Sequence, residues 1–277
     1  LSVKNLNLLY NVADADGAKL NWDDLTSDGT VGGFEGLVSS LKLQVGGSLE
    51  LGIDSYVKLA GTFLITQQTD VTFDDGNTIE FEGDLLAINI SDVYLFVGTG
   101  AGDFTYDGDG ALSGIKDTND TLITDPSTSA VGFTVSDANV NLAIIKDTTK
   151  NLKWTGVAAS IGEMAAVGID TSVFDLSVKN LNLLYNVADA NDTKLDWDNL
   201  SADSDNGITG YDGLVKTVKL EVTGQATIQI SDFVQIRGSF GFSQSTDLLV
   251  DTTDSTTQKS VSVITIGFDQ VDAFVGD

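Results

Sequence analysis

An exact internal repeat constrains the fold more than any other feature of this sequence. The fourteen residues LSVKNLNLLYNVAD occupy positions 1–14 and again positions 176–189. Looser matches follow in the same order, at 33–38 and 210–215, at 42–63 and 219–240, and at 92–98 and 270–276. Self-similarity of this kind is typical of tandem arrays. We therefore expect a first complete repeat over residues 1–175 and a second, incomplete repeat over residues 176–277. We expect further covalent repeats, or end-to-end association with identical neighbours, to continue the array at both ends.

The pattern of apolar residues predicts long β-strands. Val, Ile, Thr, Phe and Tyr recur in alternation, and the chain has 29 glycines but only one proline, Pro126. From residue 218 to 242 the apolar positions keep a single phase, which would exceed about 80 Å as one strand. We therefore expect the chain to fold back near Ser231–Asp232, and near Asp54–Ser55 in the first copy, through a three-residue connection.

The phase of the alternation reverses at four polar dipeptides. They are Ser91–Asp92, Ser136–Asp137, Lys179–Asn180 and Asp269–Gln270. A two-residue hairpin would produce such a reversal, but these hairpins favour glycine, and none of the four dipeptides contains it. A β-bulge, or a corner where the chain passes from one sheet face to another, fits as well.

Helical signals are weak, since segments 26–41 and 160–168 allow no more than a short helical turn. The predicted fold class is therefore all-β, as an elongated tandem-repeat architecture. A β-solenoid or rolled sheet is the first choice, and a string of β-sandwich modules is the alternative.

The charge of the chain excludes several classes of partner. There are 41 acidic and 14 basic residues, which give a formal net charge of −27. Such a surface repels nucleic acid and anionic lipid. No apolar run approaches the roughly 20 residues of a membrane helix, so we expect no membrane-spanning segment.

No catalytic motif is evident, and we expect the protein not to be an enzyme. The chain has neither histidine nor cysteine, and it contains no Gly-x-Ser-x-Gly elbow. A glycosidase-like enzyme is the third interpretation of function. Glu163 and Glu221 are its candidate carboxylates, because they are the acids most embedded in apolar sequence.

Two acidic loops resemble calcium loops, in which closely spaced carboxylates and a turn-making glycine surround one ion. The first is DFTYDGDGALSGIKDTND at 103–120, and the second is DADGAKLNWDD at 14–24. We predict calcium as the one candidate cofactor, with Asp107, Asp109 and Asp117 as ligands and with Asp14 and Asp16 as a second set. The alternative is that these acids are solvated and form turns.

Trp22 and Trp197 occupy equivalent positions of the two copies, each beside acidic residues. They would either stack on sugar rings or anchor a core, and a repeated core anchor is the simpler account. A secreted carbohydrate- or surface-binding module, with a surface glycan as its ligand, is accordingly the second interpretation of function.

Segments such as AVGFTVSDANVNLAIIK, INISDVYLFVG and ATIQISDFVQIRGSFGF resemble the repeat regions of giant secreted bacterial surface proteins of the adhesin type. Those proteins are acidic, poor in cysteine, often calcium-dependent and built from tandem β modules. The resemblance implies an extracellular or cell-surface location. It also implies a structural or adhesive role in a stalk, filament or surface layer, which is the first interpretation of function.

Overall fold

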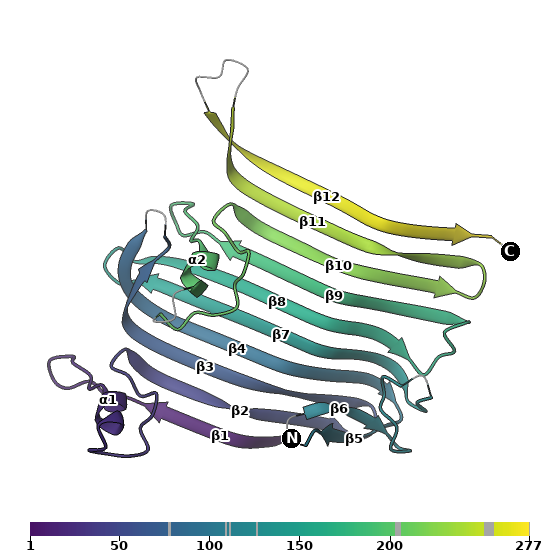
Figure 1. Ribbon diagram of the computed structural model, residues 1–277, viewed down its shortest axis with the longest axis horizontal. Coiled ribbons are helices and arrows are strands. Elements are labelled where there is room, and N and C mark those ends of the chain that lie inside the picture. The colour runs from purple at the N-terminus through teal and green to yellow at the C-terminus, as the bar shows by residue number, and fades with distance from the viewer. Residues whose placement is uncertain are drawn as a thin grey trace.

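The computed structural model describes residues 1–76, 79–108, 110, 112–125, 127–202, 206–251 and 258–276. Within these residues, ten strands form one antiparallel sheet, and β5 (Ala101–Tyr106) and β6 (Leu112–Asp117) form a small second sheet (Figure 1). The large sheet has the order β1 (Ser2–Tyr10), β2 (Leu41–Ile53), β3 (Val57–Asp74), β4 (Glu80–Thr99), β7 (Val131–Asp147), β8 (Leu152–Val167), β9 (Phe174–Val187), β10 (Val218–Ile230), β11 (Val234–Asp251) and β12 (Gln258–Val275).

Every strand of the large sheet pairs with the strand that precedes or follows it in the chain, apart from the small sheet inserted between β4 and β7. The prediction of an all-β fold is confirmed, in the form of one large antiparallel sheet. A solenoid is not confirmed, because consecutive strands are antiparallel neighbours in one sheet rather than turns of a coil. For the same reason the described residues do not form a string of separate sandwich modules.

The predicted fold-back points are confirmed. Ile53 pairs with Val57 and Ile230 pairs with Val234, so a three-residue connection joins β2 to β3 and β10 to β11. The first residue of each connection, Asp54 or Ser231, has a positive φ of 50° or 49°. These turns therefore hold the same conformation in both copies.

The phase reversals are β-bulges inside continuous strands, and the hairpin alternative is wrong. The second residue of each polar dipeptide adopts the left-handed conformation: Asp92 (φ 54°), Asp137 (φ 53°), Asn180 (φ 50°) and Gln270 (φ 51°). Asp and Asn tolerate this region because their short polar side chains can hydrogen-bond locally. A bulge adds one residue to the strand, so the apolar side chains before and after it stay on the same face of the sheet.

The bulges of neighbouring strands lie side by side across the sheet. In β8, Gly162 lies between the bulges at Asp137 and Asn180, because Glu163 pairs with Ser136 on one side and with Lys179 on the other. A Cβ on Gly162 would lie 2.9 Å from the Cβ of Asp137. Glycine is therefore required where the displaced backbone of the bulge approaches its neighbour.

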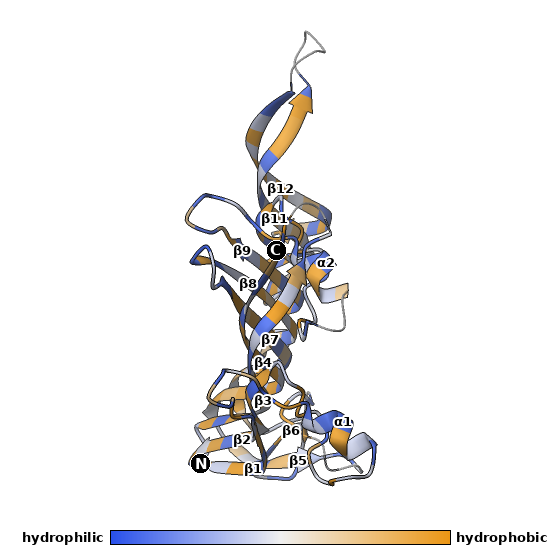
Figure 2. Cartoon of the chain, turned by 90° about the vertical axis from the view of Figure 1, so that its left-hand side faces the viewer, coloured by the Kyte–Doolittle hydropathy of each residue, from blue (hydrophilic) through white to orange (hydrophobic). Residues whose placement is uncertain are grey.

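Several corresponding elements of the two copies have equal lengths. The helices α1 (Trp22–Ser27) and α2 (Trp197–Ala202) have six residues each, β2 and β10 have 13, and β3 and β11 have 18. Both helices lie to one side of the sheet in Figure 2. Segment 160–168, which allowed a helical turn by sequence, is instead mostly part of β8, because its apolar residues continue the pattern of the sheet.

The main buried core lies between the sheet and the segment that joins β9 to β10. The sheet contributes large side chains such as Phe73, Leu85 and Trp154, and the segment contributes Trp197 and Tyr211 among others. A second, smaller cluster around Phe96 lies under β5 and β6. Both clusters lie on the same face of the sheet, since Leu85 and Phe96 are covered by these segments while the alternate residues of β4 are not.

Candidate functional site

The face that carries the two buried clusters is polar between them, and we call it the polar face. Its central side chains include Thr62, Ser91, Asn89, Asn141 and Ser160. The Asn89 amide donates to Asn141 Oδ1 at 2.8 Å, and the hydroxyls of Thr62 and Ser91 lie 2.6 Å apart. These pairs link neighbouring strands through side-chain hydrogen bonds, which suits a surface in contact with water.

Ion pairs across adjacent strands also lie on the polar face. Lys4 Nζ lies 2.6 Å from Glu50 Oε1, and the Tyr106 hydroxyl of β5 donates to the same carboxylate. The hydrogen bond to Glu50 raises the pKa of Lys4. Burial opposes ionisation of Glu50, but the hydrogen bonds from Lys4 and Tyr106 outweigh it and lower the pKa of that carboxyl. Two further pairs are Lys179–Glu163 at 3.0 Å and Arg237–Asp272 at 2.8 Å.

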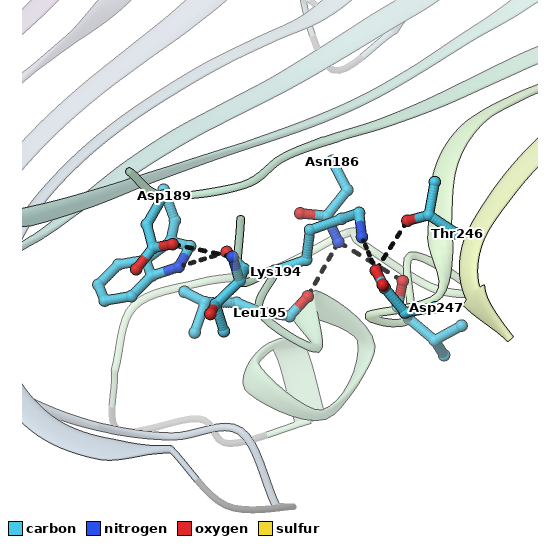
Figure 3. Close-up of polar contacts among 9 residues, drawn as sticks. Asn186, Asp189, Lys194, Leu195, Thr246 and Asp247 are labelled. Carbon is cyan, nitrogen blue, oxygen red and sulfur yellow. Dashed lines mark hydrogen bonds and ion pairs between the residues drawn. The ribbon is translucent and has the colours of Figure 1, made fainter. Parts of the chain in front are cut away.

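A buried asparagine holds the long segment between β9 and β10 in place. Asn186 Nδ2 donates to the carbonyl of Leu195 at 2.9 Å (Figure 3) and to that of Val215 at 3.5 Å. Asn186 Oδ1 accepts from Trp197 Nε1 at 3.0 Å. One side chain in β9 thus binds the segment on both sides of α2, at Leu195 and Val215, and also binds Trp197, the first residue of α2.

The first copy contains the two carbonyl contacts of this clamp. Asn11 Nδ2 donates to the carbonyls of Leu20 at 2.8 Å and Val38 at 3.2 Å, which are the positions equivalent to Leu195 and Val215. Asn11 and Asn186 both belong to the exact fourteen-residue repeat. That identity was the available sequence signal for a shared structural role, although no role was predicted for either residue.

A lysine in each copy reaches a bulged part of a strand of the same copy, β3 in the first and β11 in the second. Lys194 Nζ lies 2.8 Å from Asp247 Oδ2, and Thr246 also donates to Asp247 (Figure 3). The hydrogen bond from Lys194 lowers the pKa of Asp247, and the bond from Thr246 acts in the same direction. In the first copy Lys19 instead donates to the Thr69 hydroxyl, and burial lowers the pKa of Lys19.

A shallow hollow on the polar face lies beside the segment that carries α2. Its lining includes Asn139, Asn182, Asp212, Glu221 and Thr223. Glu163, the other predicted glycosidase carboxylate, does not line this hollow and is paired with Lys179 instead. The two glutamates are therefore not brought to one cleft.

The Asp117 carboxylate is buried and accepts hydrogen bonds from the loop that surrounds it. It is 3% exposed, and its two oxygens accept five hydrogen bonds: from the backbone of Asn119, Thr121 and Ser129, and from the hydroxyls of Ser129 and Thr128. The backbone N–H of Ser129 is the largest of several causes that hold its pKa far below the usual range. A calcium ion would have to displace some of these donors.

The other predicted calcium ligands lie apart from that environment or outside the described residues. Asp107 is exposed beside the polar face, near Tyr106 and Lys4, and Asp109 lies outside the described residues. Asp14 Oδ1 accepts from the backbone of Asp16 and Ala18, while Asp16 itself is exposed. No group of three potential metal-ligating side chains occurs among the described residues. Calcium binding therefore stays a prediction.

The carboxylates of Asp14, Asp117 and Asp189 share one turn geometry. Each accepts from the backbone N–H groups two and four residues later in the chain. Aspartate commonly stabilises turns in this way, because its side chain replaces a backbone acceptor. The spacing that resembled a calcium loop is thus also the spacing of these turns.

The two equivalent tryptophans differ in exposure. Trp197 is fully buried, and its ring packs against Tyr211 with a centroid separation of 5.4 Å. Trp22 is half-buried and packs against Phe34 at 5.2 Å. Trp197 is therefore a core residue, as the simpler account expected, and it is inaccessible to a sugar ring.

The comparisons with protein-family models, curated proteins and solved structures gave no match for this chain. Its two described helices, of six residues each, are too short to cross a membrane.

Proposed function

We propose that the chain has a structural role at the cell surface, as a segment of a sheet that grows by tandem repetition. The observation that supports this proposal is the equivalence of the two copies within one sheet. The second copy adds β9, β10, β11 and β12, which repeat the bulges of β1 to β4 and, in β10 and β11, the lengths of β2 and β3. It pairs directly with the strands of the first copy. A repeat that extends a sheet in this way provides a surface of adjustable width.

The proposal includes no catalytic role. The chain lacks histidine and cysteine, and the two glutamates that were candidates for glycoside hydrolysis do not share a hollow. A surface-binding role for the polar face is the second candidate, favoured by the hollow that Asn139, Asn182 and Glu221 line. Specific retention on a glycan array, lost when Glu221 is changed to Gln, would favour this second candidate.

The structural proposal is tested by lengthening the chain. A variant that carries one more copy of residues 1–175 adds equivalents of β1, β2, β3, β4, β7 and β8. Six strands at about 4.8 Å each should widen the sheet by roughly 29 Å. Small-angle scattering and electron microscopy measure that increase. A second compact particle tethered beside the first, with no wider sheet, would contradict the proposal.

A further inference from the structure

The face opposite the polar face is apolar on all ten strands of the large sheet, and we call it the apolar face. Because paired residues lie on the same face, the pairing of Ile88 with Leu142 and of Leu183 with Val222 carries this face across neighbouring strands. Many of its side chains are open to solvent in the isolated chain: Phe133 is 54% exposed, Ile236 40% and Phe268 73%. Nothing in the described chain covers them.

The apolar face forms a band whose width does not follow the lengths of the strands. Strands β2 to β12 of the sheet vary from 13 to 20 residues. On four of these strands, the residues that point to this face are nevertheless uncharged and almost all apolar over a run of twelve positions. The runs are 86–97 of β4, 133–144 of β7, 176–187 of β9 and 264–275 of β12. The runs shorten to nine positions in 57–65 of β3 and 234–242 of β11. The bulges keep each run on one face, since the apolar residues on both sides of Asp92 or Asp137 point the same way.

Charged and aromatic side chains mark the limits of this band. At the end of the band nearer α2, Asp84, Lys146 and Lys153 lie side by side on β4, β7 and β8. Tyr10 and Tyr185, which are equivalent in the two copies, lie on the apolar face near the same end and are 60% and 39% exposed. Tyrosine is enriched where a protein surface passes from hydrocarbon to water.

We propose that the apolar face lies against the hydrocarbon chains of a lipid bilayer, with the polar face turned toward water. Leu86 and Ile144, which end the runs of β4 and β7 on one side, are directly paired, so the limit of the band crosses the strands at right angles and its width equals the length of a run. Twelve residues that include one bulge advance by about ten intervals of about 3.3 Å, or roughly 33 Å. That distance is close to the thickness of a hydrocarbon layer, about 30 Å. A second copy of the chain would also cover an apolar face, but it would not require an apolar band whose width is independent of strand length. The proposal does not depend on the repeat having a structural role.

The lipid environment imposes one condition on the sheet. Backbone N–H and C=O groups that are left unpaired in hydrocarbon cost several kcal/mol each. The outer edges of β1 and β12 have no partner strand among the described residues. Further strands must therefore pair with both edges when the sheet lies in lipid, and other copies of the chain supply them when it is the only protein present.

The proposal is tested on the full chain with a fluorescent label. Because the chain has no cysteine, a single introduced cysteine can carry a polarity-sensitive fluorophore. Val222→Cys and Thr223→Cys place the label on the apolar and polar faces of β10, and Ile228→Cys and Thr227→Cys form a second matched pair. Each variant is folded with and without phosphatidylcholine vesicles, and circular dichroism confirms that its β-structure is retained.

The expected result alternates with residue number. With vesicles, fluorescence at positions 222 and 228 should rise several-fold and be quenched by spin-labelled lipid, while positions 223 and 227 should remain quenched by aqueous iodide. Labels that stay accessible to iodide at all four positions would overturn the proposal. It would equally be overturned if positions 222 and 228 were protected without lipid in a particle that sedimentation shows to be a dimer, because a second copy would then cover the face.

Discussion

The indole ring of Trp197 lies directly against the backbone of Gly156, so that a Cβ on Gly156 would lie 2.6 Å from the ring. Gly156 belongs to β8, and Trp197 begins α2 in the segment that covers the polar face. The segment therefore packs closely on the sheet: the largest buried side chain, Trp197, contacts the backbone of a glycine that has no side chain of its own.

Gly156→Ala should therefore destabilise the protein by about 1–3 kcal/mol, because the added methyl group forces Trp197 away from the sheet. Chemical denaturation measures the loss. Gly267→Ala in β12 is the matched control, since no atom lies within 4 Å of the Cβ it would add. Equal effects of the two substitutions would contradict this account of the docking.

Asn186→Ala should cost about 2–4 kcal/mol, since it removes the hydrogen-bond partner of the Leu195 carbonyl and of the buried Trp197 indole N–H. The fluorescence of Trp197 should also shift to longer wavelength as the segment loosens. Asn182→Ala, at an exposed position of the same strand, is the control and should change stability little. A stable Asn186 variant with unchanged fluorescence would show that the clamp is dispensable.

Asp117→Asn should lower the melting temperature by the same amount in millimolar calcium and in chelator, because hydrogen bonds to the carboxylate hold this loop. The pKa of Asp117 is lowered on folding, chiefly by the backbone N–H of Ser129. Its contribution to stability is therefore present above the unfolded pKa of about 3.9 and is lost as the pH falls further. The variant should lose that part of the acid dependence. A melting temperature of the unsubstituted chain that rises with calcium, but not in the variant, would instead assign an ion to Asp117.

Asp92→Val should cost about 1–3 kcal/mol, whereas Asp92→Asn should be nearly neutral. Residue 92 has a φ of 54°, a conformation that a β-branched side chain resists and an asparagine accepts. Urea titration of the two variants gives the comparison. Similar stabilities for valine and asparagine at this position would mean that the bulge moves or disappears at little cost.

The Tyr94 phenol should lose its proton at a higher pH than an exposed tyrosine does. Burial raises its pKa to about 12, and the hydrogen bond that its hydroxyl donates to Asp137 acts in the same direction. Because the folded pKa lies above the unfolded value of about 10, this contribution to stability is complete below pH 10 and is lost between pH 10 and about 12. In an ultraviolet titration, the Tyr94→Phe variant should lack one tyrosine ionisation near pH 12. Removal of a transition near pH 10 instead would contradict the raised pKa.

Local features of the fold could be predicted from the sequence, whereas the environment of each face could not. The phase reversal at Ser136–Asp137 marked the position of a bulge without separating it from a hairpin or a corner. The unbroken phase around Ser231 located a turn, because both features follow from side-chain alternation along one strand. Alternation alone does not say which face a segment such as 188–217 covers. A search for continuous apolar runs does not detect the apolar band, because every second residue of β4 is directed to the polar face.

The candidate calcium residues were ambiguous for a chemical reason. An aspartate that caps a turn and an aspartate that binds calcium have the same neighbours in sequence, with small or amide residues at alternate positions. Only the positions of the backbone N–H groups around Asp117 separate the two roles. The clamp of Asn11 and Asn186 was not predicted, because their partners include backbone carbonyls, which every residue type has, so the sequence does not indicate which asparagine is bonded to them.

The strand order has a mechanical consequence. The two ends of the described chain belong to strands on opposite edges of the sheet, and the ladder hydrogen bonds run perpendicular to the strands. A force that separates β1 from β12 therefore acts along these bonds and loads one pair of strands at a time. Under tension the strands should separate one after another from the edges, each at low force. The sheet should not unfold in a single event at high force.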